Sequence, residues 1–230
     1  MKTIICTIGN RDLQFYANKD TGDLSEFLLR NNDDKNFLII KKSDCNLFEL
    51  TEKIYENYDN YKEIIAFPLI EKAITNLSGN GIRLVLVPTN QNPPDSQDTF
   101  YIAGIAQKYF SEKGYESVIK SINFNPTNFN SLFTFFTEVF DNYSDNDLYC
   151  ANSGGTPQMK AASEFAGLFR NFQYITINAR SETSLSNFKH QEKIVLQAAE
   201  RIGQILVLDF LQLPFGNQLL FQPLELRQQC

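Results

Sequence analysis

The feature that most constrains the fold of this chain is an apolar segment that ends at a glycine turn and continues at once as a helix. Residues 147–151 predict a buried strand, and the polar turn after them contains Gly154 and Gly155. Beyond the turn, apolar residues recur at helical spacing. Thr156 can cap that helix, and Pro157 suits its first turn, where no backbone N–H is needed. Such a turn places several N–H groups at the positive end of a helix, which suits a phosphate or another polar ligand.

Strands and helices are predicted to alternate along most of the chain. Besides the strand at 147–151, β-rich runs lie at residues 3–8, 36–41, 82–87, 116–124 and 173–178. Helical patterns separate most of these runs, and this alternation indicates an α/β fold with a mainly parallel sheet and helices on both faces. Residues 37–40 are consecutive apolar residues, so the strand at 36–41 is expected to be buried on both faces.

The C-terminal part follows a different pattern. A long helical pattern runs over residues 190–208, and proline and glycine then interrupt short apolar pieces. We therefore expect one α/β domain over residues 1–180. Residues 181–230 are expected to form a C-terminal helical extension, or a connector to a missing partner domain. Residues 202–221 are fairly apolar, but a charge, a proline and several glutamines interrupt them, so no membrane span is predicted.

Charge and composition argue against several classes of function. The formal net charge of −6 disfavours a broad surface for duplex nucleic acid, which needs a basic excess. The four cysteines are far apart, which favours reduced core thiols over a zinc site, so no metal is expected. Neither a GxGxxG nor a GxxxxGK[ST] motif is present, and no cofactor is expected. No signal sequence precedes the first strand, so the expected location is a reducing cytoplasm.

Three unusually polar loops follow predicted strands, at residues 7–12, 88–99 and 152–156. In an open parallel sheet, ligands bind beyond the carboxyl ends of the strands, so these loops are expected to gather at one edge. Their amides, hydroxyls and one arginine suit phosphate oxygens and adenine edges. Structural alternatives stand beside this interpretation. The two glycines would then form only a tight turn, Arg11 and Asp12 would pair on the surface, and Gln91 would be a solvated loop residue.

The same loops carry motifs that resemble those of a known family. The motifs are Thr7-Ile8-Gly9-Asn10-Arg11-Asp12-Leu13-Gln14, Thr89-Asn90-Gln91 followed by Asp98-Thr99, and Ser153-Gly154-Gly155-Thr156-Pro157-Gln158-Met159. Over residues 1–180 the chain resembles the CRISPR-associated Rossmann-fold (CARF) domain, and the third motif is the most specific. These domains sense cyclic oligoadenylates made by type III CRISPR complexes. The resemblance implies a Rossmann-like fold and a homodimer, with a cyclic tetra- or hexa-adenylate bound across the two-fold axis.

The resemblance also assigns ligand-binding residues. These are Thr7, Gly9, Asn10, Arg11, Gln91, Ser153, Gly154, Gly155 and Thr156. The chain departs from the family pattern at Pro157, where many members carry a lysine. Many members also continue into an effector domain, often a HEPN ribonuclease with an arginine–histidine motif, so the resemblance implies an effector domain missing from this chain. His190 has no arginine at that spacing, so no HEPN site is expected in this chain.

Three functions are compatible with the sequence. The first is a dimeric sensor that binds a cyclic oligoadenylate. The second is a metal-independent ring nuclease, in which a ribose 2′-OH of the ligand attacks the adjacent phosphate, with Thr7, Asn10 and Arg11 as candidate catalytic residues. The third is an unrelated nucleotide-binding α/β protein.

Overall fold

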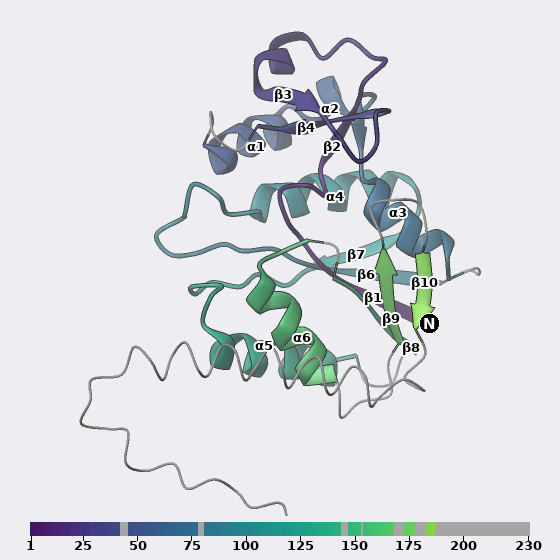
Figure 1. Cartoon of the computed structure of the whole chain (residues 1–230), viewed down its shortest axis with the longest axis vertical. Coiled ribbons are helices and arrows are strands. Elements are labelled where there is room, and N and C mark those ends of the chain that lie inside the picture. The colour runs from purple at the N-terminus through teal and green to yellow at the C-terminus, as the bar shows by residue number, and fades with distance from the viewer. Residues whose placement is uncertain are drawn as a thin grey trace, which may run out of the picture. The chain divides into compact units, whose positions relative to one another are not determined.

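Figure 1 shows a computed structural model of the chain. It describes residues 1–41, 46–77, 81–143, 147–152 and 154–167, together with the backbone of residues 173–177 and 183–186. The expected helix at 190–208 lies outside the described residues, as does most of the expected extension over 181–230. Backbone contacts divide the chain after His190. The expected division after residue 180 stays a prediction.

Strands and helices follow one another along the part of the chain that ends at His190. In chain order the described elements are β1 (Lys2–Thr7), β2 (Gln14–Tyr16), η1 (Gly22–Phe27), β3 (Leu28–Arg30), β4 (Phe37–Ile40), α1 (Leu47–Glu56), α2 (Tyr58–Tyr61), β5 (Ile65–Ala66), α3 (Pro68–Thr75), β6 (Ile82–Val87), α4 (Phe100–Glu112), β7 (Glu116–Ile119), α5 (Phe129–Asp141), β8 (Asp147–Ala151), α6 (Pro157–Gly167), β9 (Gln173–Ile177) and β10 (Thr183–Ser186). None of the helices among the described residues has the length and hydropathy that crossing a membrane requires.

The larger sheet has a Rossmann-like topology. Its six strands lie in the order β10-β9-β8-β1-β6-β7. The neighbouring strands from β9 to β7 are parallel, and β10 pairs antiparallel with β9. The chain runs outward from β1 through β6 to β7, and then returns to add β8 and β9 on the other side of β1. This reversal creates a topological switch point between β1 and β8, and the predicted α/β fold is confirmed.

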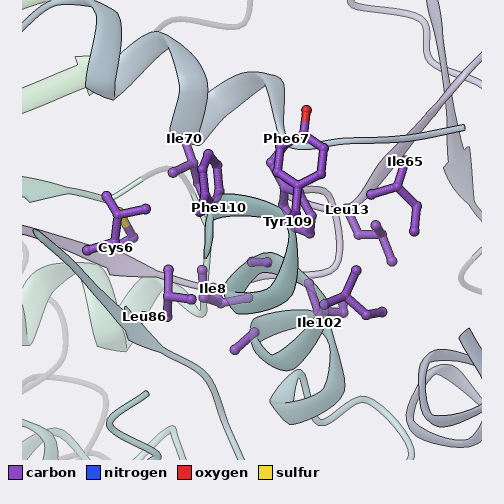
Figure 2. Close-up of a cluster of buried hydrophobic side chains, with 14 of the residues drawn as sticks. Cys6, Ile8, Leu13, Ile65, Phe67, Ile70, Leu86, Ile102, Tyr109 and Phe110 are labelled. Atoms are coloured by element: carbon purple, nitrogen blue, oxygen red, sulfur yellow. The ribbon is translucent and has the colours of Figure 1, made fainter. Parts of the chain in front are cut away.

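Helices cover both faces of this sheet (Figure 1). One core contains Ile4 and Cys6 of β1 together with side chains of α3 and α4. The other core contains Ile5 of β1 together with side chains of α5 and α6. Successive strand residues point to opposite faces, so a strand covered on both faces must be apolar at consecutive positions. Figure 2 shows part of the first core, where the rings of Phe67 and Phe110 have centroids 5.8 Å apart.

The main departure from the sequence prediction is a second, smaller sheet. This sheet is antiparallel, in the order β3-β4-β2-β5, and the chain builds it between β1 and β6. Strand β4 belongs to it, so the prediction of a strand at 36–41 buried on both faces of the parallel sheet is wrong. Ile40 is buried, whereas Phe37, Leu38 and Ile39 are half-buried. A short apolar run carries no information about which sheet it joins, because periodicity is lost when every residue is apolar.

Candidate functional site

A cavity of about 540 Å³ lies at the switch point of the larger sheet. This volume is within the range of small-molecule sites. Loops that follow β1, β6, β7 and β8 surround the cavity, all at the carboxyl ends of parallel strands. The residues that line it are Ile8, Gly9, Asn10, Thr89, Gln91, Asp95, Gln97, Asp98, Thr99, Asn125, Pro126, Thr127, Gly155, Thr156, Pro157 and Met159.

The loops after β1 and β8 touch through their backbones. A Cβ atom on Gly9 would lie 2.7 Å from the nitrogen of Gly155 and 3.0 Å from the Cα of Gly154. A Cβ atom on Gly154 would overlap the nitrogen of Gly9 and lie 2.7 Å from the carbonyl oxygen of Thr7. Both positions therefore require glycine, because any side chain would push the loops apart. The glycines do more than form a tight turn, since they allow two distant loops to close one wall of the cavity.

A buried carboxylate braces this contact. Asp12 is fully buried, and its Oδ2 accepts a hydrogen bond of 2.7 Å from the backbone N–H of Gly9. The hydroxyl of Thr7, also fully buried, donates a hydrogen bond of 2.9 Å to the carbonyl oxygen of Gly154. A buried carboxylate such as that of Asp12 is tolerated when it accepts hydrogen bonds like the one from Gly9. The alternative in which Asp12 pairs with Arg11 on the surface is therefore wrong.

The loop after β8 passes directly into α6. Gly155 has a φ of +79°, which glycine adopts freely. The hydroxyl of Thr156 accepts a hydrogen bond of 3.1 Å from the backbone N–H of Met159, and Pro157 is the first residue of α6. The predicted cap and the predicted proline position are thus confirmed. The Thr156 hydroxyl also donates a hydrogen bond of 3.0 Å to the carbonyl oxygen of Pro126, which ties this loop to the loop after β7.

Asp98 organises the loop after β6. Its side chain is buried, and its Oδ2 accepts hydrogen bonds from the backbone N–H of Gln91 at 2.8 Å and of Asp95 at 2.9 Å. Its Oδ1 accepts a hydrogen bond of 3.3 Å from the side-chain amide of Gln91. Gln91 is therefore half-buried and held at the cavity by a buried carboxylate, and its contact with a ligand stays a prediction.

Two buried threonines join the loops after β1 and β6. The hydroxyl of Thr99 donates a hydrogen bond of 3.0 Å to the carbonyl oxygen of Ile8. The same hydroxyl accepts one of 3.1 Å from the backbone N–H of Thr89, while the backbone N–H of Thr99 donates one of 3.2 Å to the hydroxyl of Thr89. Thr99 directly precedes α4, so this helix begins at the cavity wall.

The fourth loop of the site follows β7 and was not predicted from the sequence. Asn125, Pro126 and Thr127 line the cavity. The Oδ1 of Asn125 accepts hydrogen bonds from the backbone N–H of Thr127 at 3.0 Å and from its hydroxyl at 2.8 Å, which fixes the turn. The strand was expected to extend to residue 124, but β7 ends at Ile119. The turn-forming dipeptide Asn125-Pro126 just beyond a predicted parallel strand was the signal that could have identified this loop.

The residues that the resemblance assigns to ligand binding do not all line the cavity. Five of them line the cavity, namely Gly9, Asn10, Gln91, Gly155 and Thr156. Thr7 and Gly154 are hydrogen-bonded to each other outside that lining, where they join the two loops. Arg11 is not part of the lining. Ser153 lies outside the described residues.

The charge of the lining is negative. Asp95 and Asp98 are the charged residues among the described lining, which contains no lysine, arginine or histidine. The Nη1 of Arg11 lies 3.5 Å from the Oδ2 of Asp33, and the side chain of Arg11 is 67% exposed. A contact between Arg11 and a ligand therefore stays a prediction.

Burial makes two cysteines of the central strands unreactive. Cys6 and Cys150 are buried free thiols. Burial raises the pKa of both thiols, and the carboxylate of Asp12 raises that of Cys6 further. Protonated thiols are poor nucleophiles and poor metal ligands. Nowhere in the described part of the chain do three or more His, Cys, Asp or Glu side chains come together as a metal site would require.

Comparison with known proteins adds no assignment to this geometry. No protein-family model and no curated protein matches the chain. The topology and the cavity indicate a small-molecule site in an α/β fold.

Proposed function

We propose that this chain is a sensor that binds a cyclic oligoadenylate of four or six units as a homodimer. The observation that carries the proposal is the contact at the switch point, where Gly9 of the first motif meets Gly154 and Gly155 of the third. These motifs are far apart in the sequence, yet they close one wall of a single cavity. Their meeting supports a shared role in binding one ligand.

The chemistry of the lining supports a nucleotide. The side chains of Asn10, Gln91, Gln97 and Asn125 carry carboxamides, which donate and accept hydrogen bonds as the edge of adenine does. Helices α4 and α6 both begin at the cavity. The first N–H groups of α4 have no partner within the helix and favour phosphate oxygens, whereas α6 begins with Pro157 and Thr156 accepts the N–H of Met159. Contacts for base and phosphate are thus available without a metal.

The size of the cavity supports a dimer. A volume of about 540 Å³ suits one small ligand, so a ring of four or six nucleotides needs a second copy of the chain. A ring of identical units matches a two-fold axis, because each protomer then makes the same contacts with opposite units. We therefore place the ligand across the axis of a symmetric dimer.

The proposal concerns binding and leaves cleavage as the second candidate. Attack of a 2′-OH on a phosphate needs in-line positioning and stabilisation of the developing negative charge. The described lining contains no basic side chain, and Arg11 is paired with Asp33. Thr7, a candidate for catalysis, is fully buried and hydrogen-bonded to Gly154. No contact in the described residues favours a ring nuclease.

Incubation of the chain with each cyclic oligoadenylate, followed by chromatography and mass spectrometry, tests the proposal. We expect the intact ring to remain bound through gel filtration, with linear tetra-adenylate as the control that does not bind. Linear products that form in EDTA and carry a 2′,3′-cyclic phosphate would favour the ring nuclease. Absence of binding to both rings would contradict the proposal and favour an unrelated nucleotide-binding protein.

A further inference from the structure

We infer that Arg11 is a phosphate-binding arm that Asp33 holds outside the cavity until an anionic ligand binds. The inference rests on the proposed function, because it concerns how the same site meets the negative charge of its ligand. It gives a role to Asp33, which lies between β3 and β4 of the smaller sheet and outside the three sequence motifs.

A closed ring of polar contacts positions Asp33. The side-chain amide of Gln14 donates a hydrogen bond of 3.0 Å to the carbonyl oxygen of Arg11. The side-chain oxygen of Gln14 accepts one of 3.2 Å from the amide of Asn31. The side-chain oxygen of Asn31 in turn accepts one of 3.0 Å from the backbone N–H of Asp33. The contact of 3.5 Å between Asp33 Oδ2 and Arg11 Nη1 closes the ring.

The two halves of this ring differ in strength. Gln14 and Asn31 are 4% and 8% exposed, and hydrogen bonds between buried polar groups are costly to break. The side chains of Arg11 and Asp33 are 67% and 45% exposed, and pairs of exposed charges at such a distance are weak. The backbone of Asp33 is therefore held in place, while the guanidinium of Arg11 is able to leave the carboxylate for a stronger partner.

A phosphate near the cavity would be such a partner. The described lining offers Asp95 and Asp98 but no cation, so a phosphate meets net repulsion there unless a basic side chain joins it. Asn10 lines the cavity and Arg11 is the next residue, so the Cα atom of Arg11 lies only about 3.8 Å from that of a lining residue. A guanidinium forms two charge-assisted hydrogen bonds with a phosphate, which exceed its single long contact with Asp33.

Calorimetric titration of the full chain with two probes, cyclic tetra-adenylate and inorganic pyrophosphate, tests the inference. The variants are Asp33→Asn, which removes the charge and keeps the shape, Arg11→Ala, and the double variant. Asp34→Asn is the matched control. It removes the same charge one residue away, at a carboxylate that accepts a hydrogen bond from the backbone N–H of Asn36.

We expect Asp33→Asn to bind both probes about two- to fivefold more tightly than the unmodified chain, because a weak competing pair is lost. Asp34→Asn should change affinity less. Arg11→Ala should weaken binding about tenfold or more, since a charge-assisted contact is lost. In the Arg11→Ala background, Asp33→Asn should give no gain.

Equal effects of Asp33→Asn and Asp34→Asn would overturn the inference, as would a gain from Asp33→Asn that persists without Arg11. The two probes separate this inference from the proposed function. If pyrophosphate shows the expected pattern and cyclic tetra-adenylate does not bind, the arm is supported and the four-membered ring is not the ligand. If neither probe binds the unmodified chain, the inference is wrong and the four-membered ring is not the ligand.

Discussion

Replacement of Gly154 by alanine tests the contact between the two glycine loops. The new Cβ atom would overlap the Oδ2 of Asp12 and the nitrogen of Gly9, and it would lie 2.7 Å from the carbonyl oxygen of Thr7. Two of these three atoms belong to the backbone, so a change of rotamer cannot relieve the overlap. One loop must move away from the other.

The size of the effect follows from what this movement disturbs. Overpacking of a tightly packed site costs about 1–3 kcal/mol. The hydrogen bond of 2.7 Å from Gly9 to Asp12 would also weaken, and a bond to a charged group contributes about 1.5–3 kcal/mol. We expect the free energy of unfolding to fall by about 3–5 kcal/mol in total. For a chain of 230 residues this corresponds to a decrease in Tm of roughly 6–20 °C.

Urea denaturation followed by circular dichroism measures this change. Gly114→Ala is the control, because Gly114 has a φ of +83° and its new Cβ atom would meet nothing within 4 Å. That variant should lose only about 1–2 kcal/mol, from the left-handed backbone alone. If Gly154→Ala is no more destabilising than Gly114→Ala, the two loops are not in contact and the description of the cavity wall is wrong.

Three further changes test other contacts. Thr156→Val removes the cap of α6 and should lower the free energy of unfolding by about 1–2 kcal/mol, whereas Thr156→Ser should be close to neutral in the same denaturation assay. Asp98→Ala releases the backbone of Gln91 and should weaken binding of cyclic tetra-adenylate about tenfold, as measured by calorimetry. Unchanged affinity in a folded variant would show that this loop is not part of the site. The hydrogen bond to Glu52, together with desolvation and the nearby carboxylates, raises the pKa of Tyr101 from 10.0 to about 12. The stability from this bond is full below pH 10.0 and is lost as the pH rises to about 12, so Tyr101→Phe should flatten the alkaline loss of stability in a series of denaturation curves. An identical alkaline profile in this variant would refute that assignment.

Local sequence was sufficient to predict the strand, turn and helix around Gly154. The buried strand, the threonine cap and the proline at the first helical position all depend on neighbouring residues. The smaller sheet could not be predicted in this way. Its strands are two to four residues long, and Phe15 of β2 pairs with both Leu38 and Ile65, which lie far along the chain. Such pairing depends on tertiary packing, which the periodicity of apolar residues in the sequence does not report.

The candidate site, too, could be predicted from the sequence only in part. A general rule for parallel sheets predicted that three loops would meet at one edge. The roles of Asp12 and Asp98 could not be predicted, because a carboxylate becomes a buried acceptor only when distant loops pack around it. The contact between Arg11 and Asp33 could not be predicted either, because the backbone of Asp33 is held through Gln14 of β2 and Asn31, which follows β3.

The most direct test of the proposed function is a calorimetric comparison of the unmodified chain with Gly155→Asp, using cyclic tetra- and hexa-adenylate. Asp at this position combines a left-handed backbone with a negative charge at the cavity wall, which should weaken binding by more than about 100-fold. We predict that one of the two rings binds the unmodified chain with one ring for every two chains, as a two-fold axis requires. We also predict that folded Gly155→Asp does not bind that ring. No heat of binding with either ring, or equal affinity in the two proteins, would contradict the account.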